Sequence, residues 1–172
     1  EIARFDTFVN PERPIPYNIQ QLTGITNDDV RDAPSQIEAV RMFLDFAGDR
    51  VMAAHNASFD IGFISQACER NGITFEPVYI DTLTIAQGLY PELKNHKLDT
   101  VAGFIGLPDF KHHRASDDAV TTGLMLAEML GKMKQEGIEK LSEINAYIQG
   151  HRKTAAARRR FRPYHIILIA KN

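Results

Sequence analysis

The sequence predicts an α/β domain in which a mixed β-sheet is flanked by helices. Segments of strand character alternate with segments of helical periodicity along residues 1–149, the pattern that produces such a sheet. Polar stretches fall where predicted strands pass into predicted helices, which is where folds of this kind place their sites. A length of 172 residues, 44% of them hydrophobic, suffices for one domain with a buried core.

The first predicted strand and helices have recognisable endings. Residues 1–9 alternate loosely between apolar and polar side chains, and Pro11 ends this predicted strand in the turn-forming stretch NPERPIP. The polar, glycine-containing residues 18–30 predict a short helix and a turn. Residues 33–49 predict an amphipathic helix that ends near Gly48 and has one apolar stripe, formed by Ile37, Val40, Phe43, Leu44 and Ala47.

Two further strands are predicted, each followed by helical periodicity. The small apolar run RVMAAH (50–55) predicts a strand, and residues 59–72 predict a helix that ends at Asn71 and Gly72. PVYID (77–81) predicts the next strand, and residues 82–90 and 97–106 predict two short helices. A long helix is predicted for residues 116–135 and a last one for residues 139–149.

Charge is distributed unevenly along the chain. Residues 151–172 hold seven of the 20 Lys and Arg residues and none of the 22 Asp and Glu residues, so this tail has a net charge of +7 and the preceding residues −9. An acidic body argues against duplex binding through charge alone, but it is compatible with a carboxylate site that collects metal ions and contacts a strand end. We interpret the tail as a basic linker rather than a nucleic-acid-binding segment.

The composition also limits the location of the protein. No apolar run approaches the roughly 20 residues that a membrane helix needs, and no secretion signal is visible, so we expect a cytoplasmic protein without a membrane partner. The single cysteine, Cys68, fits a reducing compartment and has the spacing of a core residue. Because the chain begins with Glu1 instead of Met, we expect a fragment or a processed piece.

Two aspartates stand at the starts of predicted helices, each with a histidine five residues before it. Asp60 follows His55 in HNASFD, and Asp118 follows His113 in HRASDDA. Carboxylates that are distant in sequence but close in space can hold Mg²⁺ or Mn²⁺, because these hard cations prefer oxygen ligands. A lone aspartate at such a position is more often a helix-capping or first-turn acid, and the two histidines shift the balance toward a metal site.

His113 lies in a loop that Lys111, His112 and Arg114 make hydrophilic. A loop histidine beside a metal can take a proton from the water that attacks phosphorus, since its unperturbed pKa of about 6.5 suits neutral pH. An exposed polar residue without a catalytic role is an equally good interpretation of the sequence alone. A zinc site is disfavoured because there is one cysteine and no His-x-x-x-His pair.

HNASFD and HRASDDA resemble the second and third motifs of the DEDDh 3′-to-5′ exonucleases, whose fold is the RNase H-like sheet. The resemblance implies that His113 is the general base and that Asp60 and Asp118, not Asp117, are ligands of two Mg²⁺ or Mn²⁺ ions. It also implies that residues of HNASFD and of QQLTGIT contact the substrate, although a plain turn explains QQLTGIT nearly as well. These substrate-binding candidates are Leu22, Thr23, Gly24, His55, Asn56 and Phe59.

Three other stretches, FVNPERPIP, LTGIT and RPYHIILIAKN, resemble the proofreading domain inserted in PolC-type DNA polymerase III α subunits. This resemblance implies a single-stranded DNA 3′ end as substrate, and the rest of a replicative polymerase chain and replisome subunits as partners. Residues 1–149 would then be the exonuclease domain, residues 150–162 a basic linker, and residues 163–172 the start of a strand in the enclosing PHP-type domain.

The first motif of the family, Asp-x-Glu, does not occur in the 172 residues. It would supply two of the family's four carboxylates, so we expect the first strand or strands to be missing and the chain by itself to be nearly inactive. Asp81 or Asp99 would be the substitute acid if the chain proved active. Two other interpretations stay open: a ribonuclease of the same superfamily, separated only by contacts to the 2′-OH, and a non-catalytic insert that binds single-stranded DNA or a partner subunit.

Overall fold

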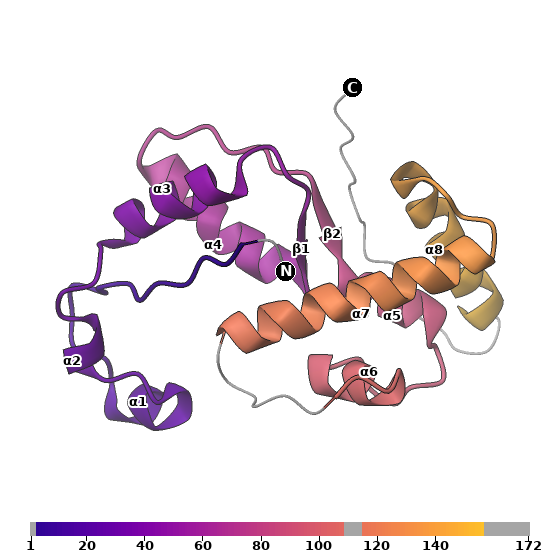
Figure 1. The fold of residues 1–172 in the computed structure, drawn as a ribbon, viewed down its shortest axis with the longest axis horizontal. Helices are drawn as coiled ribbons and strands as arrows, with labels where there is room; N and C mark the ends of the chain where they lie inside the picture. The colour runs from indigo at the N-terminus through magenta and orange to yellow at the C-terminus, as the bar shows by residue number, and fades with distance from the viewer. Residues whose placement is uncertain (1–2, 109–114, 157–172) are drawn as a thin grey trace. The chain divides into compact units, whose positions relative to one another are not determined.

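The computed structural model of the chain describes residues 3–108 and 115–156, with side chains through Gly150 (Figure 1). These residues belong to two compact units. The first unit comprises Glu1–Arg50 and Phe59–Pro77, and the second comprises Val51–Ser58 and Val78–Asn172.

The first unit is helical in its described residues. Two of its helices begin with a reciprocal capping box, in which a hydroxyl and an acid three residues later satisfy each other's backbone N–H groups: Thr26 with Asp29, and Ser35 with Glu38. Gly24 ends the first helix in the left-handed conformation, with φ 71°. The helices are α1 (Tyr17–Thr23), α2 (Asn27–Val30), α3 (Gln36–Ala47) and most of α4 (Ala57–Arg70).

The strand predicted for residues 1–9 is not formed: Ala3 to Val9 have no regular secondary structure, and residues 1 and 2 lie outside the described part. Asn10 forms an isolated parallel bridge with Ser35, and its N–H donates to the carbonyl of Pro34 at 2.8 Å. Loose alternation of apolar residues is too weak a signal, because a strand requires a neighbour along its whole length. The apolar side of this stretch packs on α3 instead, where Phe5 stacks on Phe46 with ring centres 5.6 Å apart.

The second unit contains the sheet, and here the predicted alternation of strands and helices is confirmed. β1 (Met52–Ala54) and β2 (Tyr79–Asp81) are parallel neighbours, with Met52 opposite Tyr79 and Ala54 opposite Asp81. The chain segment between the two parallel strands includes α4, as a parallel pair requires a crossover. The other helices are α5 (Thr82–Leu89), α6 (Leu98–Phe104), α7 (Ala115–Gln135) and α8 (Leu141–Ala156).

One stripe of α7 forms the centre of the core in the second unit. Met125, Met129 and Met133 lie on this stripe and are at most 1% exposed. α5 and α8 approach each other closely, because a Cβ atom at Gly88 would lie only 3.0 Å from Cγ2 of Ile148. Ile148 is itself 2% exposed, so α8 is part of this core up to that residue.

α8 extends further than the predicted helix 139–149, because it continues through Gly150 to Ala156. The residues HRKTAA, predicted as the start of a basic linker, are therefore helical, and their alanines and basic residues have high helix propensity. The remainder of that linker and the strand predicted for 163–172 lie outside the described residues. None of the helices in the described part of the chain is long and apolar enough to cross a membrane.

Candidate active site

The motif HNASFD forms the turn after β1 and the first four residues of α4. β1 ends at Ala54, and α4 begins at Ala57, so only His55 and Asn56 connect the strand to the helix. Asn56 has a φ of 73°, a left-handed conformation that asparagine adopts more readily than most residues. Its side-chain oxygen accepts a hydrogen bond from the Ser58 hydroxyl at 3.4 Å. The sequence therefore needs asparagine here partly for the backbone conformation.

Asp81 ends β2 and connects the two strand ends. Its Oδ1 accepts hydrogen bonds from the backbone N–H groups of Asn56 and Leu83, both at 3.0 Å, and its Oδ2 accepts one from the Thr84 hydroxyl, also at 3.0 Å. The bond to Leu83 is a helix N-cap of α5. The bond to Asn56 reaches across the sheet, since parallel strands end at the same edge.

Both ring nitrogens of His55 have partners within the second unit. Nε2 lies 2.7 Å from the carbonyl oxygen of His96, and Nδ1 lies 3.0 Å from Oγ1 of Thr82, a residue with no exposed surface. A carbonyl oxygen can only accept a hydrogen bond, so Nε2 of His55 carries the ring proton and donates a hydrogen bond to the His96 carbonyl. The Thr82 hydroxyl can donate either to Nδ1 or to the Ala54 carbonyl, which is 3.2 Å away.

Burial lowers the pKa of His55 below its ordinary value of 6.5, and a smaller contribution from the neighbouring His96 acts in the same direction. The hydrogen bond to the His96 carbonyl and the charges of Asp81 and Asp99 oppose this shift. A lowered pKa keeps the ring neutral at pH 7, with the proton on Nε2. His55, predicted as a substrate-binding residue, is therefore already used within the protein to hold the turn.

Asp117 and Asp118 lie in the first turn of α7 and are both half-buried. The backbone carbonyl of Asp117 accepts a hydrogen bond from the Thr121 hydroxyl at 2.9 Å, within the helix. Successive side chains on a helix point about 100° apart, so the two carboxylates face different directions. His113, the predicted general base, lies in residues 109–114, outside the described part of the chain.

Asp60 lies in the first turn of α4 and is exposed, and it belongs to the first unit, whereas Asp118 belongs to the second. Phe59 and Phe63 stand on the same helix, 63% and 57% exposed, and their rings make an edge-to-face contact with centres 4.9 Å apart. Phe59 is thus accessible, as a residue predicted to contact substrate must be.

The predicted substrate segment Leu22, Thr23 and Gly24 forms the end of α1 and its cap. Leu22 is 67% exposed. The Thr23 hydroxyl donates to the carbonyl of Ile19 at 2.8 Å and accepts from the N–H of Ile25 at 3.2 Å. These bonds stabilise the turn at the end of α1. Of these three residues, Leu22 offers the clearest surface for a ligand.

Within the described residues, no group of three or more His, Cys, Asp or Glu side chains is arranged to hold a metal ion. The donors that the motifs do supply, two carboxylates in first helical turns, are oxygen ligands of the kind Mg²⁺ and Mn²⁺ prefer. Asp99, the other acid considered as a substitute ligand, accepts the N–H of Thr100 at 2.6 Å.

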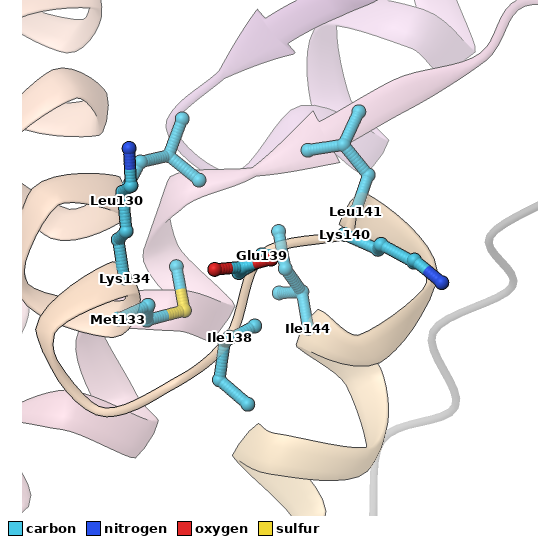
Figure 2. A pocket seen from close by; sticks show the side chains of 8 residues that line it. All are labelled: Leu130, Met133, Lys134, Ile138, Glu139, Lys140, Leu141 and Ile144. Atoms are coloured by element: carbon cyan, nitrogen blue, oxygen red, sulfur yellow. The ribbon is translucent and has the colours of Figure 1, made fainter.

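One cavity in the second unit lies apart from these residues. It has a volume of about 440 Å³ and lies between the end of α7 and the start of α8 (Figure 2). Its lining combines apolar side chains with three charged ones: Leu130, Met133, Lys134, Ile138, Glu139, Lys140, Leu141 and Ile144. None of the predicted site residues lines it.

HNASFD thus follows β1, and the predicted ligand Asp118 lies in the first turn of α7. The chain belongs to the exonuclease family, whose RNase T model matches residues 1–126. It is 40% identical to the PolC-type DNA polymerase III of Caldanaerobacter subterraneus subsp. tengcongensis over 171 residues and 39% identical to that of Bacillus subtilis over 175 residues. Each comparison covers 99% of this chain and 12% of the relative, so the chain spans about an eighth of their length.

Solved structures agree with the predicted RNase H-like exonuclease fold. An exonuclease X in complex with a 5′-overhanging duplex DNA is 25% identical, with a TM-score of 0.59 over 81% of this chain and 78% of that one. A full-length 3′-exonuclease superimposes with a TM-score of 0.61 at 20% identity, over 77% of this chain and 47% of the other. The predictions of the exonuclease family and of the fold class are therefore confirmed.

Proposed function

We propose that these residues are the proofreading 3′-to-5′ exonuclease domain of a PolC-type bacterial replicative DNA polymerase. In this function the domain hydrolyses the 3′ end of single-stranded DNA to nucleoside 5′-monophosphates, in the cytoplasm. The observation that carries the proposal is the order of the two motifs on the fold: HNASFD in the turn after β1 and the start of α4, and Asp118 in the first turn of α7. The identity of about 40% to PolC-type polymerases extends over nearly the whole chain, which supports this particular family member.

Asp60 and Asp118 are proposed as the residues that hold Mg²⁺ or Mn²⁺. Bound divalent ions stabilise the charge on the attacking and leaving oxygens of a phosphodiester. His113 removes the proton of the attacking water, since a histidine titrates close to neutral pH. Asp117 takes no part, because it points about 100° away from Asp118 on the same helix.

We propose that the substrate is contacted by those candidate residues whose side chains are exposed. Leu22 and Phe59 are more than 60% exposed and offer apolar surfaces on which a terminal base can lie. Asn56 is exposed and is proposed to contribute a polar group to the substrate contacts. Thr23, Gly24 and His55 are proposed to act by fixing the backbone that presents these side chains.

A polypeptide of the 172 residues alone is proposed to be nearly inactive. Asp60 and Asp118 are two of the four carboxylates in the resembled family, and no Asp-x-Glu occurs in this sequence. Fixing two ions requires more oxygen ligands than two side chains provide. The same deficit favours the second candidate function, a non-catalytic insert that binds single-stranded DNA or a partner subunit.

The proposed boundaries place the exonuclease domain in residues 1–149, the basic linker in 150–162 and the first strand of an enclosing PHP-type domain in 163–172. Ile144 and Ile148 of α8 belong to the hydrophobic core, which supports the inclusion of α8 up to Ile148 in the exonuclease domain. The rest of the polymerase and the replisome subunits are the proposed partners. Removal of the residues after Gly150 should leave the thermal unfolding of the preceding residues almost unchanged, and a large loss of stability would place the strand inside the domain.

The direct experiment is a nuclease assay on the protein as its gene encodes it, with Mn²⁺ and 5′-labelled single-stranded DNA or RNA of the same sequence. The proposal expects stepwise shortening from the 3′ end of the DNA, release of nucleoside 5′-monophosphates, and loss of activity in Asp118→Ala but not in Asp117→Ala. Faster cleavage of the RNA would indicate a ribonuclease of the same superfamily. Tight DNA binding without cleavage would indicate the non-catalytic insert.

A further inference from the structure

The Asp81 carboxylate is the most connected acidic group at the sheet edge, and neither of the two motifs contains it. It receives three hydrogen bonds from groups that belong to two separate stretches of chain, Asn56 on one side and Leu83 and Thr84 on the other. All of these residues lie in the second unit. The carboxylate thus joins the turn that follows β1 to the helix that follows β2.

We propose that Asp81 is a positioning residue of the exonuclease motif, which holds the backbone of Asn56 in the turn before α4 and is not itself a ligand of the metal ions. The proposal rests on the proposed function, because it assigns a role within that same site. Asn56 has the left-handed conformation with φ 73°, and its N–H points to Oδ1 of Asp81 at 3.0 Å. A hydrogen bond from a backbone N–H to an ionised carboxylate is stronger than one to a neutral acceptor, so it can offset the cost of this conformation.

Thr82 and His55 form a second connection across the same edge. The Thr82 hydroxyl lies within 3.2 Å of the Ala54 carbonyl and 3.0 Å from Nδ1 of His55, which in turn donates through Nε2 to the His96 carbonyl. The two residues of the turn are therefore held separately, Asn56 by its backbone and His55 by its ring. Asp81 is the residue whose loss would release the backbone of the turn.

The hydrogen-bonding pattern separates a positioning role from a ligand role. In Asp81→Asn, Oδ1 still accepts both N–H groups, and Nδ2 can donate to the Thr84 hydroxyl once that hydroxyl turns to accept. Asp81→Ala removes all three bonds. A metal ligand behaves differently, because an amide lacks the negative charge that holds a divalent cation and its substitution is then as damaging as alanine.

The experiment measures turnover, KM and the Mn²⁺ concentration for half-maximal activity on 5′-labelled single-stranded DNA, in the protein as its gene encodes it. Asp81→Ala should lower kcat by about tenfold or more, and Asp81→Asn should stay within about threefold of the wild type with an unchanged Mn²⁺ requirement. Thr84→Val, which removes only the bond to Oδ2, is the matched control and should also stay within about threefold. Thermal unfolding of each variant separates these effects from general loss of the fold.

Hydrogen–deuterium exchange at the amides of Asn56 and Leu83 provides a readout that is independent of activity. Both amides should be protected in the wild type and in Asp81→Asn, and both should lose protection in Asp81→Ala. An Asp81→Asn variant as inactive as Asp81→Ala, with a raised Mn²⁺ requirement, would overturn the proposal and make Asp81 a ligand, and so would full activity in Asp81→Ala. An inactive wild type would overturn the proposed function instead, and the exchange data would still decide whether Asp81 holds the turn.

Discussion

The two helices that carry the predicted metal ligands are positioned in different ways. α4 begins immediately after a connection of two residues: the N–H of Asn56 donates to Asp81, and the ring of His55 forms hydrogen bonds with the Thr82 hydroxyl and the His96 carbonyl. α7 has its acids in a half-buried first turn, and its anchorage lies further along, where Met125, Met129 and Met133 fill the core. In the described residues, the turn before α4 is therefore held by polar contacts, and α7 is held by apolar burial along its length.

This difference predicts which substitutions should be severe at each helix. Polar contacts at the start of a helix fix the direction of the helix precisely but involve few atoms. Single substitutions of these residues should therefore change activity more than stability. Apolar burial fixes a helix through many weak contacts, so the loss of one large side chain lowers stability first. The following substitutions separate these two kinds of effect.

The largest effect is expected for the ligand at the start of α7. Asp118→Ala should lower nuclease turnover by about 10³-fold or more, because metal ions contribute several kcal/mol to the stabilisation of the transition state. Asp117→Ala is the matched neighbour on the same turn and should be mild. If Asp117→Ala is instead the more damaging of the two in the single-stranded DNA assay, the assignment of the ligand is shifted by one residue.

The next effect concerns the anchorage of α7. Met129→Ala should lower the stability of α7 by about 3 kcal/mol, the usual cost of removing most of a fully buried methionine side chain. Hydrogen–deuterium exchange of the α7 amides measures this loss directly. Leu124→Ala, on the same helix but 44% exposed, is the control and should cost less than about 1 kcal/mol. Equal losses at both positions would show that the buried stripe does not anchor the helix.

His113→Ala should lower turnover by roughly 10²-fold, or about 2.7 kcal/mol, while DNA binding stays nearly unchanged, because a general base acts on water and not on the strand. Single-turnover rates and binding affinity measured on the same DNA separate the two quantities. Replacement of His112, the adjacent histidine, provides the control. An unchanged single-turnover rate in His113→Ala would remove this residue from the role of base.

The smallest effect is expected from the pH dependence of the turn before α4. Folding lowers the pKa of His55, so the unfolded chain binds a proton more readily. The contribution of His55 to the free energy of unfolding is therefore fully present above pH 6.5 and is lost as the pH falls through the pKa of the folded state. Urea unfolding at pH 7.5 and 5.5 should show this loss in the wild type and a smaller one in His55→Gln. An equal pH dependence of the unfolding free energy in the two proteins would contradict a neutral His55 ring in the folded state.

Much of the fold could be predicted from the sequence, because apolar periodicity and caps are local signals. The strands predicted in 50–55 and 77–81 contain β1 and β2, and the helix predicted for 116–135 differs from α7 by one residue at its start. The strand predicted for residues 1–9 was wrong, since pairing with a neighbour cannot be inferred from one loosely alternating segment. The end of α8 was predicted too early because the basic residues after Gly150 were interpreted as a linker.

Only the motif residues of the candidate site could be predicted from the sequence. HNASFD and HRASDDA indicated Asp60, His113 and Asp118, but they gave no information about the residues that hold the motif in place. Asp81 and Thr82 contact residues more than twenty positions away, through bonds that arise only when two parallel strands end at the same edge. A usable signal did exist, since an aspartate that ends a predicted strand and starts a helix is a typical N-cap.

The central proposal is that Asp60 and Asp118 both contribute to metal binding. A Mn²⁺ titration of the gene-encoded protein with Asp60→Ala and with Asp118→Ala tests it directly. Each single substitution should weaken Mn²⁺ binding by at least about tenfold. Affinities that do not change would contradict the proposal.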